Sequence, residues 1–288
     1  MATSPSHQLG ELIGDFFELA IIEYLKPIVL EKGYYLDFRH PREARGGKRE
    51  VIGVDYNGNS HKLDIVIEKN GSENRFGTPK AFIEVAWRRY VKHSKNKVQE
   101  IEGAILPLIK THEMHIPFYV AVLAGQFTEN ALKQLKTQGF YVLYINYEDF
   151  LAFFNKNGLP IRWEENTSRD ELQKLYKRLS SLSEEKLLQL RRQFYDYFKD
   201  QLDELAANLS DSLDATVKEV IVIPLHGCEK RLETISEAID FVLNYDEDKL
   251  EPILRYEIAI RYNNGMEYSV KCRNRIVAVQ ILNQYLNK

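Results

Sequence analysis

Asp64 and Glu84 each stand inside a short apolar run, residues 61–68 and residues 81–87. Both runs have the length and composition of β-strands, and a charged group is rarely buried in such a segment without a partner. A hard cation such as Mg²⁺ prefers oxygen ligands, and a metal held by two strand carboxylates can activate water and stabilise a phosphoryl transition state. The pair therefore indicates metal-dependent hydrolysis. The alternative for either residue alone is a side chain that points to solvent, because strand side chains alternate between faces.

Helical and strand periodicities surround this pair over residues 1–160. The expected elements are a helix at 8–31, strands at 51–56, 61–68 and 81–87, a helix at 94–108, a strand at 117–123, a helix at 128–137, a strand at 140–145 and a helix at 147–155. Three consecutive strands with short links suggest a meander, and the later alternation of strand and helix suggests a parallel edge. The order predicts an α/β domain, a mixed sheet flanked by helices, over residues 1–160.

The rest of the chain has a different character. Residues 169–212 carry leucines and phenylalanines at helical spacing, which predicts a helical pair with Ser183 as the cap between its helices. Such a stripe is either a core face or a dimer face, so residues 161–214 are interpreted as a helical linker or dimerisation segment. Residues 215–288 alternate strand and helix patterns around an Asn-Asn-Gly turn. They predict a small α+β domain that could recognise DNA.

Composition narrows the class of protein. The chain has 288 residues, a formal net charge of -3 and two cysteines, Cys228 and Cys272. So few cysteines argue against a disulfide framework, and no apolar run approaches the roughly 20 residues that cross a bilayer. We expect a cytoplasmic protein with no membrane segment. Any affinity for nucleic acid must come from local basic patches rather than from the whole chain.

Two segments supply such patches. The loop at residues 39–50 has a formal charge of +3 and two adjacent glycines, and residues 87–97 contain five cations and two aromatic side chains. Lysine and arginine in such segments can neutralise DNA phosphates, although each segment could instead be an ordinary solvated loop. The DNA-binding candidates are Arg45, Lys48, Arg49, Arg88, Arg89, Lys92, Lys95 and Lys97.

The stretch from residue 14 to residue 123 resembles the PD-(D/E)XK nuclease superfamily, which includes most type II restriction endonucleases. The first expected helix carries Gly14-Asp15-Phe16-Phe17-Glu18, which is similar to the Gly-x-x-x-Glu of these nucleases. Asp64 and Glu84 fall where the family places its two metal-binding acids, and the helix at 94–108 matches the helix that follows. The resemblance implies Mg²⁺-dependent cleavage of double-stranded DNA, with Asp64 and Glu84 as metal ligands and Glu18 completing the site directly or through water.

One position departs from the family pattern. Ala86 stands two residues after Glu84, where the family has a lysine that orients or deprotonates the attacking water. Lys62, Arg88 and Lys97 could each replace that lysine. Lys62 is preferred, because on a regular strand it shares the face of the acid two residues later.

Three hypotheses follow from these observations. The first is a restriction-type endonuclease that acts as a homodimer, because cutting both strands of a palindrome needs two sites related by a two-fold axis. The second is a nuclease-fold protein that binds DNA or another partner without cutting, because Ala86 has replaced the lysine. The third is a structure-selective repair nuclease.

Overall fold

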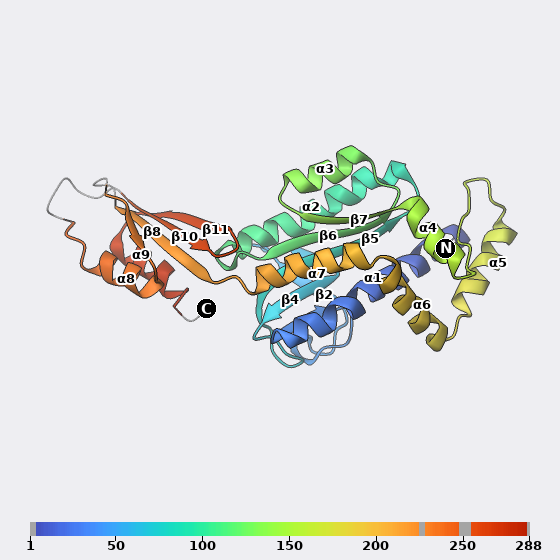
Figure 1. The fold of residues 1–288 in the computed structure, drawn as a ribbon, viewed down its shortest axis with the longest axis horizontal. Helices are drawn as coiled ribbons and strands as arrows, with labels where there is room; N and C mark the ends of the chain where they lie inside the picture. The colour runs from blue at the N-terminus through green and yellow to red at the C-terminus, as the bar shows by residue number, and fades with distance from the viewer. Residues whose placement is uncertain (1–3, 225–227, 248–254, 287–288) are drawn as a thin grey trace. The chain divides into compact units, whose positions relative to one another are not determined.

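The computed structural model describes residues 4–224, 228–247 and 255–286 (Figure 1). The protein is a mixed α/β protein, with 48% helix and 25% strand and a mixed sheet flanked by helices. This confirms the predicted fold class as far as a mixed α/β fold with a helix-flanked sheet. The chain forms two compact units, Met1–Ser210 (unit 1) and Asp211–Lys288 (unit 2).

A five-stranded sheet lies at the centre of unit 1, in the order β1-β4-β5-β6-β7. β1 and β5 run antiparallel to β4, whereas β5, β6 and β7 run parallel to one another. The expected parallel edge is therefore present. The strands are β1 (Tyr34–Phe38), β4 (Ile65–Lys69), β5 (Thr78–Arg88), β6 (Phe118–Gly125) and β7 (Tyr141–Asn146), with β2 (Val51–Val54) and β3 (Ser60–Leu63) in a separate hairpin.

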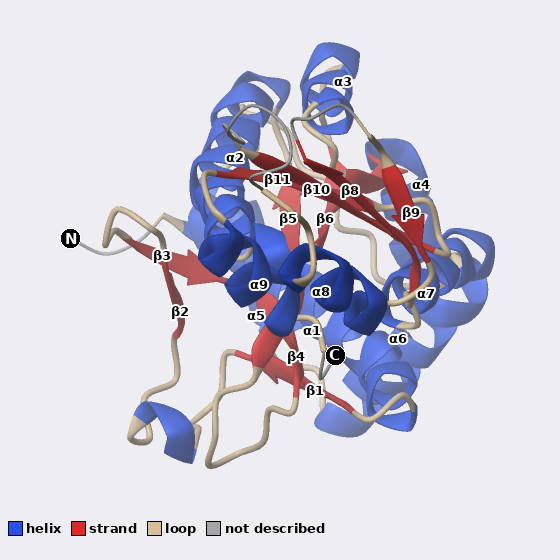
Figure 2. Ribbon diagram, turned by 90° about the vertical axis from the view of Figure 1, so that its left-hand side faces the viewer, coloured by secondary structure: helices blue, strands red, loops and turns tan. Residues whose placement is uncertain are grey.

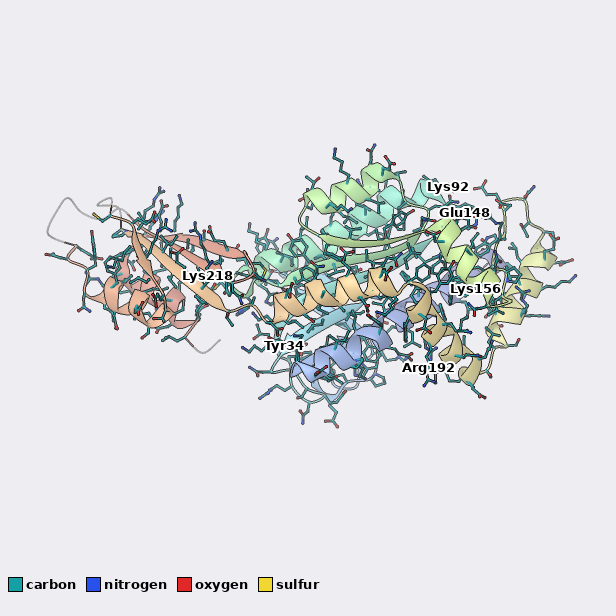
Figure 3. All side chains as sticks on the ribbon, viewed as in Figure 1. Tyr34, Lys92, Glu148, Lys156, Arg192 and Lys218 are labelled. Atoms are coloured by element: carbon teal, nitrogen blue, oxygen red, sulfur yellow. The ribbon has the colours of Figure 1, made fainter. Side chains whose placement is uncertain are left out.

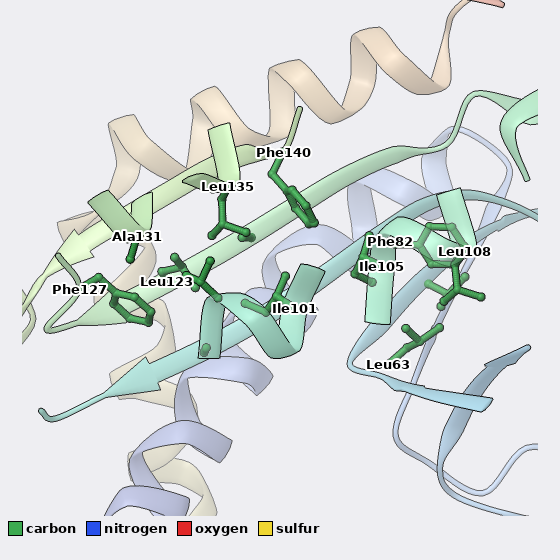
Figure 4. Close-up of a cluster of buried hydrophobic side chains, with 14 of the residues drawn as sticks. Leu63, Phe82, Ile101, Ile105, Leu108, Leu123, Phe127, Ala131, Leu135 and Phe140 are labelled. Atoms are coloured by element: carbon green, nitrogen blue, oxygen red, sulfur yellow. The ribbon is translucent and has the colours of Figure 1, made fainter. Parts of the chain in front are cut away.

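Helices α2 (Ser94–Thr111) and α3 (Glu129–Thr137) cover one face of this sheet (Figure 1). α2 is amphipathic and turns a buried stripe inward, because its apolar residues recur every three or four positions. Figure 4 shows this core, in which side chains of α2 and α3 meet those of β5 and β6. The stripe consists of Val98, Ile101, Ile105 and Leu108.

Helix α1 (Pro5–Glu31) packs against β5 and β1. It begins at Ser4, whose side chain accepts a hydrogen bond from the backbone N–H of His7 at 3.3 Å. Pro27 lies inside the helix and does not end it. The chain leaves the helix at Gly33, where φ is +77°. That left-handed conformation favours glycine.

The predicted helical pair is wrong, because the segment forms three helices after α4 (Tyr147–Lys156). These are α5 (Arg169–Ser180), α6 (Glu184–Tyr197) and α7 (Lys199–Leu213). Ser183 caps α6, as predicted. The expected second helix is interrupted at Phe198, whose ring packs 4.7 Å from that of Phe194 in a cluster with Phe153 and Phe150. The interruption lets both flanking helices bury their apolar faces, and this packing places α5, α6 and most of α7 in unit 1.

Two features of the first strands also differ from the expectation. The aromatic run Tyr34–Phe38 is a strand that the periodicity did not predict, and it pairs with β4 at the edge of the sheet. The expected strand at 61–68 is two strands, β3 and β4, which join different sheets on either side of Asp64. The three early strands are therefore not a meander.

Unit 2 contains a four-stranded antiparallel sheet in the order β11-β10-β8-β9. Its two helices pack against each other on one face of this sheet (Figure 2). β9 is a short polar segment that pairs with β8 before α8 begins. The elements are β8 (Val217–Pro224), β9 (Lys230–Leu232), α8 (Ile235–Leu243), β10 (Tyr256–Tyr262), β11 (Glu267–Cys272) and α9 (Arg275–Asn283).

Across residues 4–224, 228–247 and 255–286, none of the helices combines the length and the apolar character that crossing a bilayer requires.

Candidate active site

Asp64 and Glu84 lie directly beside each other in unit 1. β4 and β5 pair Ile65 with Ile83, so the next position in the register sets Asp64 opposite Glu84. Each carboxylate accepts a hydrogen bond from the neighbouring segment. Oδ2 of Asp64 accepts from the backbone N–H of Val85 at 2.8 Å, and Oε1 of Glu84 accepts from the backbone N–H of Asp64 at 3.4 Å. These reciprocal bonds fix both carboxylates at one point of the sheet.

The break between β3 and β4 creates this arrangement. β3 ends at Leu63 in the hairpin with β2, and β4 starts at Ile65 in the main sheet. Leu63 and Val66 both enter the core beneath α2, so the regular alternation of side chains does not hold across Asp64. Asp64 therefore belongs to neither β3 nor β4, and its side chain remains partly accessible to solvent. Glu84, within β5, is 5% exposed.

A third acid belongs to the same electrostatic cluster. Burial and the negative charge of Asp64 raise the pKa of Glu18 on α1 to about 7. Burial raises the pKa of Glu84, and the charge of Asp64 raises it further. Burial likewise raises the pKa of Asp64, opposed by the Val85 N–H and by Lys97 and Arg88. All three acids thus hold protons more tightly than in water, chiefly because burial penalises their charged forms, and a bound cation would favour those charged forms.

Asp64 and Glu18 line a cleft of about 610 Å³. One wall is α1, which contributes Gly14, Asp15 and Glu18, and the opposite wall is formed by the end of β5 and the first turns of α2. Glu84 lies beneath this surface, and Asp64 reaches it. The cleft is also lined by residues that the sequence did not single out as site residues, including Ser6, His7, Asn96, Glu100 and Trp163.

The oxygen ligands of this site suit Mg²⁺ chemically, but the protein side chains do not form a complete coordination sphere. Within the described ranges, no three or more His, Cys, Asp or Glu side chains form a group that could hold a metal ion. Mg²⁺ commonly keeps several water ligands and is held through one or two protein carboxylates. Two adjacent carboxylates with raised pKa values, Asp64 and Glu84, meet that smaller requirement.

Lys97 is the lysine that the structure brings to the acids. It lines the cleft, its side chain is 18% exposed, and its charge lowers the pKa values of Asp64, Glu84 and Glu18. Lys62, which the sequence favoured, is 76% exposed and lies 3.9 Å from a Glu50 carboxylate oxygen, outside the lining of the cleft. The strand break at Asp64 removes the regular alternation on which that preference rested.

Arg88 also lines the cleft, where its guanidinium lies 3.9 Å from a carboxylate oxygen of Glu100. Ala86 is 4% exposed and belongs to the core beneath α2, together with Val98 and Ile101. The side chain at this position therefore contributes to packing, and the lysine and arginines that line the cleft are Lys97, Arg88 and Arg89.

Two of the predicted DNA-binding arginines have structural roles instead. Arg45 is 7% exposed and donates to Oδ2 of Asp37 at 2.5 Å. Arg89 is 7% exposed, donates to the carbonyl oxygen of Trp163 at 3.0 Å and pairs with Glu164. Each guanidinium donates to acceptors of its own unit, and Arg89 also lines the cleft.

The other predicted DNA-binding cations lie at the surface. Lys48, Arg49 and Lys95 are exposed. Lys92 extends from the surface of unit 1, as Figure 3 shows, with its ammonium 2.9 Å from a carboxylate oxygen of Glu165. With Arg88 and Lys97 in the cleft, these residues remain predictions for DNA contact.

Comparisons with known proteins assign neither a family nor an activity. No protein-family model and no curated protein matches the sequence. A solved structure described as a protein of unknown function, AF1548, aligns with a TM-score of 0.30 at 15% identity, over 67% of this chain and 99% of that one.

Proposed function

We propose that unit 1 is a Mg²⁺-dependent endonuclease of the PD-(D/E)XK type, comparable to type II restriction enzymes, that hydrolyses phosphodiester bonds of double-stranded DNA. One observation carries the proposal. Asp64 and Glu84 adjoin at a strand break, beside Glu18 and Lys97, at a cleft of about 610 Å³. The resemblance of the sequence around these acids to that superfamily supports the same reaction.

Each side chain has a separate role in the proposed reaction. Asp64 and Glu84 would hold Mg²⁺, which supplies charge stabilisation at the phosphate and a more acidic water. Lys97 would stabilise the negative charge that develops on the phosphate oxygens, because its ammonium is partly desolvated and held in the cleft. Glu18 has a pKa of about 7, which suits a group that accepts a proton from water near neutral pH.

The second candidate is a protein that binds DNA or another partner through this cleft without cutting. Ala86 at the position of the family lysine favours it, as does the lack of a three-ligand group in the described part of the chain. In that case Lys97 and Arg88 would contribute to binding alone.

Digestion of long phage DNA tests the proposal. Wild type, Asp64→Ala, Lys97→Ala and the matched control Lys62→Ala are incubated with Mg²⁺ or with EDTA. We expect cleavage by wild type and Lys62→Ala only, and only with Mg²⁺. Discrete fragments would identify a restriction-type enzyme, whereas cleavage of branched but not linear DNA would identify a structure-selective nuclease.

The same panel contains the results that oppose the proposal. Cleavage by Asp64→Ala at the wild-type rate would refute the assignment of the site. Binding of DNA by wild type with no cleavage under any of these conditions would instead favour the second candidate.

A further inference from the structure

Among the described residues of unit 2, no strand pairs with the outer edge of β11. In the sheet order β11-β10-β8-β9, β11 pairs only with β10 across the described part of unit 2. That pairing is regular from Glu267 to Cys272, and the strand contains neither a proline nor a bulge. Such an edge presents unpaired N–H and C=O groups and can accept a further strand.

The hairpin geometry identifies which backbone groups face this edge. Tyr262 donates its backbone N–H to the carbonyl oxygen of Met266 at 2.9 Å, so these two residues form a hydrogen-bonded pair. Hydrogen-bonded and non-hydrogen-bonded pairs alternate along an antiparallel ladder. The residues of β11 that point their N–H and C=O groups away from β10 are therefore Glu267, Ser269 and Lys271.

A second copy of β11 fits this edge in one favoured register. If two copies pair antiparallel around Ser269, Glu267 of each copy lies opposite Lys271 of the other, and every outward-facing group finds a partner. Sliding the register by two residues leaves some of these groups unpaired and separates the opposite charges. The side chains of all three residues are exposed and share one face of the strand. The edge is thus complementary to itself in backbone hydrogen bonding. Glu267 and Lys271 pair with Arg261 and Glu257 of β10 within each copy, and the proposed register adds a second opposite charge beside each of them.

An exposed apolar surface adjoins the same edge. α9 follows β11 after two residues, and its first turn carries Ile276, which is 70% exposed, and Val277, which is 37% exposed. Ile276 is the most exposed of the large apolar side chains in the described ranges. In this antiparallel register Cys272 of one copy lies opposite Met266 of the other, so the first turn of each α9 starts beside the hairpin turn of the other copy. Removing these side chains from water would favour association.

We propose that the protein forms a homodimer through β11, with the sheets of two copies joined at Ser269 about a two-fold axis. The interface is isologous, because the same residues contribute from both sides. It rests on unit 2 alone and holds whether or not unit 1 is a nuclease. A single strand pair with one adjoining helix turn is a small contact, so the dimer is expected to be concentration-dependent.

Sedimentation velocity of the full chain tests the proposal, at protein concentrations from about 1 µM to about 100 µM, a range suited to a small interface. The informative variant is Ser269→Pro, which removes an edge N–H that β10 does not use and which an edge strand tolerates. Its matched control is Ser269→Ala, which keeps the N–H. We expect wild type and Ser269→Ala to dimerise equally, and Ser269→Pro to raise the dimer dissociation constant at least about tenfold.

Two results would overturn the proposal: wild type that stays monomeric throughout this range, or Ser269→Pro that dimerises as wild type does. If circular dichroism shows that Ser269→Pro does not fold, Ile276→Glu decides in its place. Ile276 is 70% exposed, so a charge there leaves the monomer intact but opposes the proposed contact. Unchanged dimerisation of Ile276→Glu would then exclude this interface.

Discussion

Replacing Glu18 by glutamine tests the electrostatics of the acidic cluster without requiring any assay of activity. The folded protein raises the pKa of Glu18 from 4.5 to about 7, through burial and then the charge of Asp64. Between these two values the folded state keeps a proton that the unfolded state has already released. The stabilisation from this proton is fully present below pH 4.5 and is lost as the pH rises through about 7. Glutamine carries no charge at any pH, so the Glu18→Gln variant should not lose this stabilisation as the pH rises.

The size of the effect follows from the same values. At about 1.4 kcal/mol for each pH unit between 4.5 and 7, ionised Glu18 would cost about 3 kcal/mol. The side chain is only partly buried and solvent screens its charge, so about 1–2 kcal/mol is the better expectation. Glu18→Gln should therefore be more stable than wild type by about that amount near pH 8.5, and about equal to it near pH 4.5.

Guanidinium denaturation followed by tryptophan fluorescence measures this difference. Trp87 and Trp163 are the two tryptophans of the chain, and both are buried beside the cleft, so the signal reports on unit 1. Glu31→Gln is the matched control, because Glu31 is the exposed last residue of the same helix. Mg²⁺ that binds only the folded state should stabilise wild type most at high pH, by about 2.7 kcal/mol at a concentration of 100 times its dissociation constant.

The reasoning would be refuted if Glu18→Gln lowered the free energy of unfolding equally at both pH values. That result would mean that Glu18 stabilises the fold through contacts rather than opposing it through its charge. Equal stabilisation by Mg²⁺ at both pH values would show that any bound metal lies away from this cluster.

The remaining predictions concern the core and the cleft. Arg42→Ala should lower the free energy of unfolding by about 3–5 kcal/mol, because it leaves the buried Glu68 without its ion-pair partner and removes one of the two arginines that pair with Asp37. The exposed Arg49→Ala should change it by less than about 0.5 kcal/mol in the same denaturation assay. Phe194→Ala should cost about 3–5 kcal/mol by the same measurement, because the ring is fully buried. Lys97→Ala should slow DNA cleavage about 100-fold or more in a Mg²⁺-dependent assay while thermal unfolding is little changed, and equal rates for wild type and the variant would exclude a role for this cation in the reaction.

The sequence predicted most helices and parallel strands correctly, because their periodicity reports directly on burial. α2 is an example, since the spacing of Val98, Ile101, Ile105 and Leu108 identifies its buried face. β1 was missed because its five residues are too few to show a period, and their burial depends on pairing with β4, which is distant in sequence. The break at Phe198 was missed because the apolar spacing continues across it, and only the packing of the phenylalanine cluster requires the helix to end there.

The sequence likewise allowed only part of the candidate site to be predicted. The proximity of Asp64 and Glu84 could be inferred, since each interrupts an apolar strand and adjacent strands pair. The partners of the arginines could not be inferred, because they come from distant segments. Arg89 meets Trp163 and Glu164, and no local pattern connects these residues. A basic segment in a sequence therefore does not establish a basic surface.

In the proposed nuclease site, the cation comes from a helix and not from the strand position at which the nuclease superfamily has its lysine. Ala86 contacts the same core as Val98 and Ile101, so its small side chain suits the close approach of α2 to β5. The same helix carries Lys97 in its first turn, at the edge of the cleft. A lysine side chain at position 86 would have to fit into the packed core between α2 and β5. Lys97, on α2, instead approaches the acids from the edge of the cleft. A search for Glu-x-Lys along β5 therefore finds no cation, although the charge of Lys97 acts on Asp64, Glu84 and Glu18 alike.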